Sequence, residues 1–276
     1  MVLAAAFIVP HGALILDASP SQSDGRYEVK QAMIQIANKI TELNPDVIII
    51  TSPHGISLAK DFGLYYNEYA SGSAEWNGEY QDYKVHVTID LDFTKELLTY
   101  LENYGLPVDR IMAFSRREPI PLRWGETVPL WFLRDLSDLR YVFISQPQKK
   151  SQVSKDFISI TVDFGTHLGK IISMHKKRIV VIISADLAHT HEKSGPYGHY
   201  KDAELFDRLV EKWIIGYNDP TLSSKIYSHL DKALCCGFTG MLMLQGILGE
   251  DQIRRKVLIR KSPTYYGMMV ASFLVG

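Results

Sequence analysis

Short, almost fully apolar segments alternate with amphipathic helical patterns along the chain, and this alternation constrains the fold more than any other feature. Residues 47–50 are Val-Ile-Ile-Ile, the pattern of a strand that is buried on both faces of a parallel sheet. Residues 27–43 carry apolar side chains at the spacing of an amphipathic helix, which Asn44-Pro45 should end. The alternation predicts an α/β layer structure, with a largely parallel or mixed central sheet flanked by helices.

The remaining elements follow from the same patterns. Further strands are expected at residues 2–9, 62–66, 83–89, 140–145, 178–184, 256–260 and 268–275. Further helices are expected at residues 93–104, 129–136, 153–175, 203–215 and 232–248, with a polar loop at 185–200. Because no Pro-, Ser- or Gly-rich linker and no repeat interrupts the pattern, we predict a single domain over residues 1–276.

Composition excludes several classes of partner. The chain is 46% hydrophobic and 22% charged, which is typical of a globular protein, and its net charge of −1 comes without a basic stripe. We therefore expect no nucleic-acid partner. The apolar opening lacks a positive leader and is too short to span a bilayer, so no membrane association is expected. Adjacent Cys235 and Cys236 are poor candidates for a structural disulfide, which favours a reduced, cytoplasmic setting.

Two Pro-His-Gly tripeptides, centred on His11 and His54, each follow an apolar strand. In open α/β sheets, ligands bind outside the carboxyl ends of the strands. If the two strands are neighbours in a parallel sheet, both imidazoles emerge at one edge, and the glycine after each histidine lets the backbone turn tightly. Two neutral imidazoles on rigid strand ends can begin a transition-metal site. A lone Pro-His-Gly is more typical of a histidine that caps a strand, but the matched pair favours a functional site.

The segment 184–189, Ser-Ala-Asp-Leu-Ala-His, again follows an apolar strand. His189 has a side chain suited to general acid–base catalysis, and Asp186 can orient a neighbouring group. The alternative is a turn stabilised by the Ser and Asp side chains, with His189 in solvent.

Candidates for a third metal ligand are less specific. A thiolate from Cys235 or Cys236 would suit a soft or borderline metal, although each cysteine alone is more typical of a small core residue. Glu126 is an acidic alternative, in the segment Arg-Trp-Gly-Glu-Thr-Val-Pro-Leu at 123–130. On its own, that segment predicts a solvated loop ahead of a helix whose first turn contains Pro129.

In this order and spacing, the motifs resemble those of the class III extradiol ring-cleaving dioxygenases, the LigB-type superfamily that includes the Memo proteins. The two Pro-His-Gly tripeptides are similar to the two ligand-histidine motifs of that family. The segment 184–189 is similar to the one that carries its catalytic histidine, and 124–130 to an active-site Asp-His-Gly-x-x-Val-Pro-Leu segment. The resemblance covers nearly the whole chain.

Two departures bear on the chemistry. Trp124 replaces the histidine of the Asp-His-Gly segment, and Arg123 replaces its acid. Ring-cleaving members complete their iron site with a glutamate near the C-terminus, whereas the resemblance places Cys236 in that position, as in Memo-like proteins.

The resemblance implies a metal-dependent, extradiol-type dioxygenase that acts on a catechol-like aromatic and dioxygen. The implied cofactor is a divalent metal. Fe(II) is the metal that the resemblance favours, and Zn and Cu are the alternatives. The implied metal ligands are His11, His54 and Cys236; the catalytic residues, His189 and Asp186; and the substrate contacts, Glu126, Trp124 and His191. The alternatives are a Memo-like metal-binding or redox protein without ring cleavage, and a binding protein that has lost the metal. Family members commonly associate, so the resemblance is compatible with a homo-oligomer.

One aromatic-rich stretch adds a weaker signal. Its side chains can wall a pocket for a planar ligand, although such aromatics are as often core or interface residues: Tyr65, Tyr66, Tyr69, Trp76, Tyr80 and Tyr83.

Overall fold

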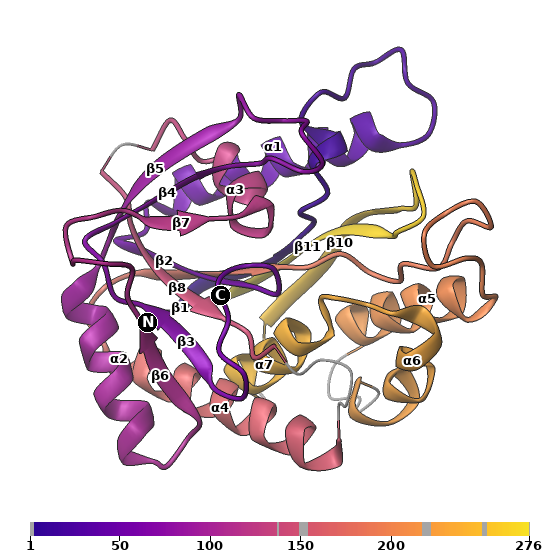
Figure 1. Cartoon of the computed structure of the whole chain (residues 1–276). Helices are drawn as coiled ribbons and strands as arrows, with labels where there is room; N and C mark the ends of the chain where they lie inside the picture. Colours follow the sequence, from indigo (N-terminus) through magenta and orange to yellow (C-terminus); the bar gives the residue numbers. More distant parts are fainter. Residues whose placement is uncertain (1–2, 137, 149–153, 217–221, 250–252, 276) are drawn as a thin grey trace.

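The computed structural model describes residues 3–136, 138–148, 154–216, 222–249 and 253–275. Within these ranges, eleven strands form one mixed sheet that is flanked by seven α-helices (Figure 1). The predicted α/β class with a mixed central sheet is confirmed.

The bounds of the elements are as follows. The strands are β1 (Leu3–Val9), β2 (Val47–Ser52), β3 (Phe62–Tyr65), β4 (Tyr69–Ser73), β5 (Lys84–Ile89), β6 (Val108–Ile111), β7 (Ile120–Leu122), β8 (Arg140–Ser145), β9 (Ile179–Ser184), β10 (Ile253–Lys261) and β11 (Met268–Val275). The α-helices are α1 (Arg26–Leu43), α2 (Leu91–Asn103), α3 (Trp124–Trp131), α4 (Lys155–Met174), α5 (Asp202–Ile215), α6 (Leu230–Ala233) and α7 (Phe238–Leu248). Short 3-10 segments lie at Ala13–Ile15 and Tyr227–His229, and a π-helical turn lies at Leu222–Ile226.

Most expected elements are present, and three short strands were not expected. The strands β4, β6 and β7 have only three to five residues each, too few for a two-residue periodicity to stand out. Residue 2 of the first expected strand and residue 153 of the expected helix 153–175 lie outside the described residues.

The centre of the sheet is a parallel block with the order β1-β9-β2-β8. The condition considered for the two histidines, that the first two strands are neighbours, is not met, because β9 lies between β1 and β2. Both neighbours of β9, which are β1 and β2, end beside the carboxyl end of β9, where Val9 is paired with Ser184 and Thr51 with Ile183. The segments that follow the three strands therefore meet at one edge of the sheet.

Both faces of the sheet are covered, which explains the continuous apolar strands. Side chains alternate across β2, so that Ile48 and Ile50 pack on one face while Val47 and Ile49 pack on the other. Helices α1 and α3 cover the first face, and α2, α4 and α7 cover the second (Figure 1). All six residues of β2 and of β9 are buried as a result.

Two helix boundaries differ from the expectation. The helix expected at 129–136 begins at Trp124, so Pro129 lies inside α3, and the segment expected to be a solvated loop is its buried first turn. The side chain of Glu126 explains this early start, because it accepts a hydrogen bond from the backbone N–H of Arg123 and so caps the helix.

The continuous helix expected at 232–248 is also wrong, because the chain breaks between α6 and α7. Leu234 ends α6 in the left-handed conformation, with φ of 54°. The break is held by Asp186, whose carbonyl oxygen accepts hydrogen bonds from the Cys235 thiol and the Gly237 N–H. The largely apolar composition of residues 232–248 favoured one continuous helix and did not reveal the contact that interrupts it.

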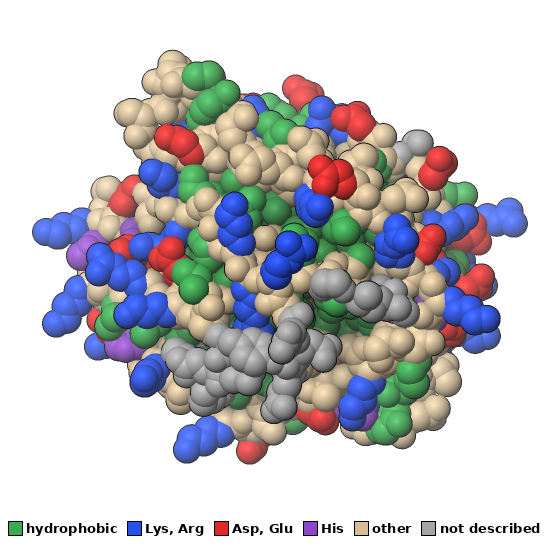
Figure 2. All heavy atoms as spheres, turned by 180° about the vertical axis from the view of Figure 1, so that it is seen from behind, with side chains coloured by type: hydrophobic (Ala, Val, Ile, Leu, Met, Phe, Trp, Pro, Cys, Tyr) green, Lys and Arg blue, Asp and Glu red, His purple; other side chains and the backbone are tan. Residues whose placement is uncertain are grey.

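On the face seen in Figure 2, basic and acidic side chains are interspersed with apolar ones. None of the helices in the described part of the chain has the length and apolar character needed to cross a membrane.

Candidate metal centre

His11, His54 and Cys236 converge at the carboxyl edge of the parallel block. His11 follows β1 and His54 follows β2, and their rings meet edge to face with centroids 4.8 Å apart. The break between α6 and α7 adds Cys236. One ligand atom from each of the three residues lies within 4.8 Å of the others. Strands two places apart in a sheet are about 10 Å apart, so the two imidazoles must lean toward each other over the end of β9.

The donor atoms suit a borderline or soft divalent metal. The Nε2 atom of His11 lies 3.4 Å from the Sγ atom of Cys236. Nitrogen and sulfur ligands of one tetrahedral zinc ion are separated by roughly 3.5 Å, given the usual bond lengths. Two imidazoles and a thiolate also match the ligand types that Zn, Cu and Fe accept in proteins. The three residues therefore fit a transition metal.

The neighbouring thiols of Cys235 and Cys236 have different surroundings. The Cys235 side chain packs against the apolar core, donates to the Asp186 carbonyl oxygen at 3.3 Å, and has a pKa raised well above its ordinary value by burial. A thiol held protonated in this way is a poor ligand. Cys236 is the cysteine that faces the two histidines.

The surroundings of His11 are polar and almost fully buried. The Asp186 carboxylate accepts the backbone N–H of His11 at 3.2 Å, and its second oxygen lies 3.3 Å from His11 Nε2. Burial raises the pKa of Asp186 to about 7, although the backbone N–H groups of His11 and Gly12 oppose the shift. On the other side of the ring, Ser184 Oγ lies 2.9 Å from His11 Nδ1. The sequence segment 184–189 therefore supplies two direct neighbours of His11.

The loop of His54 is held by α3 and β3. Trp124 stacks on the imidazole of His54, with centroids 5.1 Å apart and planes 29° apart. The Tyr65 hydroxyl accepts the N–H of Ile56 at 2.8 Å and donates to the Glu126 carboxylate at 3.0 Å. Glu126 was expected to contact a substrate or the metal, but the structure shows its two oxygens accepting from Tyr65 and from the Arg123 backbone N–H.

The glycines that follow the two histidines are required by close packing, and not by a left-handed backbone. A Cβ atom at Gly12 would collide with the hydroxyl of Tyr266 and the methyl of Met268. A Cβ atom at Gly55 would collide with the carboxylate of Glu126 and the hydroxyl of Tyr65. The sequence analysis expected these glycines to allow a tight turn, whereas the structure shows that they make room for neighbouring side chains. The sequence did not indicate which side chains these are.

His189 lies in an aromatic group beside Gly12. Its ring stacks on Tyr266, with centroids 5.6 Å apart, and Tyr266 in turn contacts Gly12. The Nδ1 atom of His189 lies 2.9 Å from the Leu187 carbonyl oxygen. Since a carbonyl can only accept, Nδ1 carries the proton, and in the neutral ring Nε2 then has the lone pair. Tyr266 was missed by the sequence analysis; its only signal was a Tyr-Tyr-Gly run between the last two strands.

His191 is bound to α5. Its Nε2 atom lies 2.9 Å from the carboxylate of Asp207, which is fully buried and also accepts the N–H of Ala188 at 3.0 Å. The backbone N–H of His191 donates to the Tyr265 carbonyl oxygen. These contacts hold Ala188 and His191, the two ends of the short segment that contains His189.

The aromatic-rich stretch divides between the site and other regions. The rings of Trp76 and Trp124 meet edge to face, with centroids 4.4 Å apart. Trp76 therefore extends the aromatic surface that Trp124 forms beside His54. Tyr65 bonds Glu126, as described above. Tyr69, in contrast, stacks on His86 in the β4–β5 pair.

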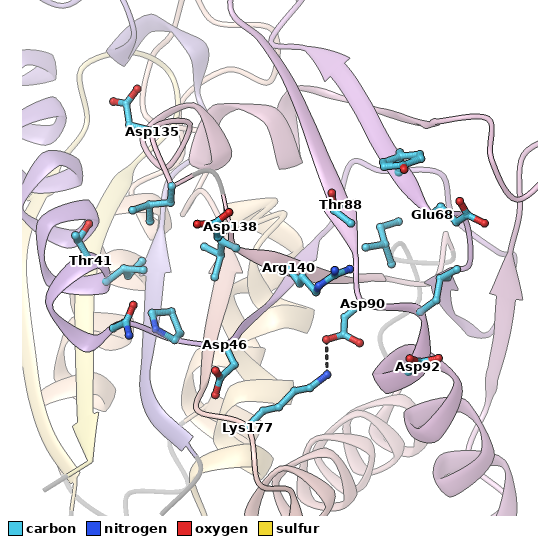
Figure 3. A pocket seen from close by; sticks show the side chains of 18 of the residues that line it. Thr41, Asp46, Glu68, Thr88, Asp90, Asp92, Asp135, Asp138, Arg140 and Lys177 are labelled. Atoms are coloured by element: carbon cyan, nitrogen blue, oxygen red, sulfur yellow. Dashed lines mark hydrogen bonds and ion pairs between the residues drawn. The ribbon is translucent and has the colours of Figure 1, made fainter.

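A cavity of about 1210 Å³ lies at the opposite edge of the sheet, at the amino ends of β2 and β8. Its lining is mixed in charge, with Arg140 near several aspartates and Lys177 paired with Asp90 (Figure 3). The lining includes none of the three candidate metal ligands. The chemistry of the candidate site is therefore separate from this cavity.

The buried carboxyl of Glu126 predicts a pH dependence of stability. Burial raises its pKa from 4.5 to about 7, so the folded protein binds this proton more tightly than the unfolded chain. The carboxyl's contribution is therefore present below pH 4.5 and is lost as the pH rises toward 7, by up to about 3 kcal/mol. We expect the free energy of unfolding of metal-free Glu126→Gln to decline less than that of the unsubstituted protein between pH 4.5 and 8. Denaturant titrations of both proteins at several pH values measure this decline. An equal decline in the free energy of unfolding for the two proteins would contradict the prediction.

The fold and the site together define an α/β protein with a candidate two-histidine, one-cysteine metal centre at the carboxyl edge of parallel strands. The family model described as the catalytic LigB subunit of aromatic ring-opening dioxygenase matches residues 5–276. The chain belongs to this LigB family, as the sequence motifs indicated.

Two individual proteins are also similar to the chain. Protein CA_C1420 of Clostridium acetobutylicum is 26% identical over 262 residues, which are 91% of this chain and 53% of that protein. The chain thus spans about half the length of this curated relative. The crystal structure of the uncharacterized protein JW3007 from Escherichia coli K12 has a TM-score of 0.64 and 14% identity, and the match covers 97% of this chain and 98% of that one. This second likeness supports the fold.

Proposed function

We propose that the protein is a metal-dependent, extradiol-type dioxygenase whose metal is held by His11, His54 and Cys236. Fe(II) is the favoured metal. The observation that carries the proposal is the approach of three ligand atoms to within 4.8 Å of one another at the edge of the sheet where α/β enzymes bind ligands. Membership of the LigB family supports a ring-opening reaction on a catechol-like aromatic.

The bound metal would supply a site where a catechol and dioxygen meet and exchange electrons. The chain's own residues would orient the substrate and move its protons. Trp124 and Tyr266 present aromatic surfaces on the His54 side and the Gly12 side of the centre, which suits a planar ring. His189, with its lone pair on Nε2, would accept a proton from a substrate hydroxyl and later return it. Asp186 would hold the His11 segment in place through its backbone hydrogen bond.

A second candidate is a Memo-like metal-binding or redox protein without ring cleavage. Two observations favour it. The third candidate ligand is the thiol of Cys236, which would make the donor set softer than two histidines and a carboxylate. Trp124 stands where ring-cleaving relatives have a histidine, and it covers one face of His54.

Anaerobic loading of the metal-free protein with Fe(II), followed by a panel of catechols in air, tests the proposal. We expect yellow ring-opened products with matching oxygen uptake, and none from His54→Ala treated in the same way. Metal analysis after loading separates the alternatives. Bound iron without turnover across the panel would favour the second candidate, and failure to bind Fe(II), Cu(II) or Zn(II) would rule out both.

A further inference from the structure

Ser184 is the last residue of β9 and lies between the strand ends that carry His11 and His54. Its side chain is fully buried. Its hydroxyl oxygen lies 2.9 Å from His11 Nδ1, and the hydroxyl donates a hydrogen bond to the carbonyl oxygen of Gly125 in α3. Ser184 thus joins β1, β9 and α3 at the candidate metal centre.

The single proton of the hydroxyl determines the direction of both bonds. A carbonyl oxygen can only accept a hydrogen bond, so the hydroxyl must donate in this pair. The Ser184 proton must therefore point at Gly125. The oxygen of Ser184 then has only lone pairs to offer to His11, so the proton between Ser184 and His11 belongs to Nδ1 of the imidazole.

Pro129 explains why the Gly125 carbonyl can take this role. In an α-helix, the carbonyl of residue 125 would accept from the N–H of residue 129. Proline has no N–H, so Pro129 cannot donate that bond. A proline inside the buried helix α3 thus leaves the Gly125 carbonyl without its usual helical donor, and Ser184 donates to it instead.

The other nitrogen of His11 lies among different groups. Nε2 is 3.3 Å from an oxygen of Asp186 and 3.4 Å from Cys236 Sγ. A neutral imidazole has one N–H, and either Ser184 at Nδ1 or the Asp186 carboxylate at Nε2 can accept it. A proton on Nε2 would block the nitrogen that faces Cys236.

We propose that Ser184 is a positioning residue that holds the neutral His11 imidazole in its Nδ1–H form, so that Nε2 presents a lone pair to a metal beside Cys236. The proposal rests on the metal centre proposed above. It also explains why a serine is buried at the end of an otherwise apolar strand, since a side chain without a hydroxyl would leave both Gly125 and His11 without this partner.

The tautomer can be observed without any metal. Metal-free protein with ¹⁵N-labelled histidine, studied by long-range ¹H–¹⁵N correlation in alkaline buffer, should show the neutral His11 ring protonated at Nδ1. The signal is assigned by its loss in His11→Gln. In Ser184→Ala, we expect the proton to move wholly or partly to Nε2. An Nε2–H form in the unsubstituted protein would overturn the inference.

Metal affinity provides the second measurement, with Co(II) as the probe and its thiolate absorption as the signal. Ser184→Ala should bind Co(II) about 10- to 100-fold more weakly, the usual effect of removing a residue that orients a ligand histidine. Ser184→Thr, which keeps the hydroxyl, should recover most of the loss.

Ser145 offers a matched control for this substitution. It ends the neighbouring strand β8, it is 2% exposed, and its Oγ has no hydrogen-bond partner among the described residues. Ser145→Ala should therefore change the Co(II) affinity by less than about twofold. Equal affinities of Ser184→Ala and the unsubstituted protein would refute the inference. If no form of the protein bound Co(II), the proposed metal centre would fail, whereas the tautomer spectrum would still decide the role of Ser184.

Discussion

Cys236→Ser should weaken the binding of Co(II) or Zn(II) by at least about 100-fold, because it replaces a thiolate with a hydroxyl that stays protonated and is a poor ligand for these metals. The remaining His11 and His54 can hold an ion only weakly. The measurement is a competition titration of metal-free protein against a chelator of known affinity, with loss of the Co(II)–thiolate absorption as an independent signal.

Cys235→Ser is the matched control, since it makes the same change one residue away. The Cys235 thiol donates to the Asp186 carbonyl, a bond that a serine hydroxyl can also make. We expect its metal affinity to stay within about threefold of that of the unsubstituted protein. If Cys235→Ser removed the metal and Cys236→Ser did not, the assignment of the third ligand would be reversed. If neither had an effect, the thiols would not be ligands.

Asp207→Ala should lower the free energy of unfolding by about 3 kcal/mol, the range for leaving two buried hydrogen-bonding groups without their partner. The substitution leaves the His191 Nε2 atom and the Ala188 N–H without their acceptor in the interior. In a chain of this size, that loss corresponds to a decrease of about 6–10 °C in Tm. Thermal denaturation of the metal-free protein, followed by circular dichroism, measures it.

Asp202→Ala is the control for this prediction. Asp202 lies on the same helix and also pairs with a histidine, His229, at 2.9 Å, but its side chain is partly exposed, whereas that of Asp207 is fully buried. Its removal should shift the Tm much less, because water replaces the lost partner. Equal shifts for the two variants would show that the Asp207 pair does not anchor the segment of His189. Asp207→Asn, which can still accept the Ala188 N–H, should fall between them.

Local sequence patterns were sufficient for the architecture. Continuous apolar strands such as β2 and β9 can be stable only where helices cover both faces of a sheet, so their composition already implied the layers. The strand that precedes each Pro-His-Gly placed His11 and His54 at a carboxyl edge. The motif order also indicated the LigB family, which the family match confirms.

Contacts between distant segments could not be inferred in this way. The Tyr65 hydroxyl that donates to the buried Glu126 carboxylate lies 61 residues away in the sequence. The break before α7 depends on the Asp186 carbonyl, and the close approach to Gly12 depends on Tyr266. In each case the two residues in contact belong to different segments of the chain, so no local sequence pattern links them.

The sequence by itself determined the α/β class, the two histidines at strand ends and the family, because these follow from short-range periodicity and from motifs of a few residues. Only the tertiary structure decided that β9 separates the two histidine strands, that the Cys235 thiol donates to the Asp186 carbonyl, and that Ser184 contacts His11. The physical reason is that strand order and side-chain contacts are set by packing between segments far apart in the chain, which local patterns do not encode.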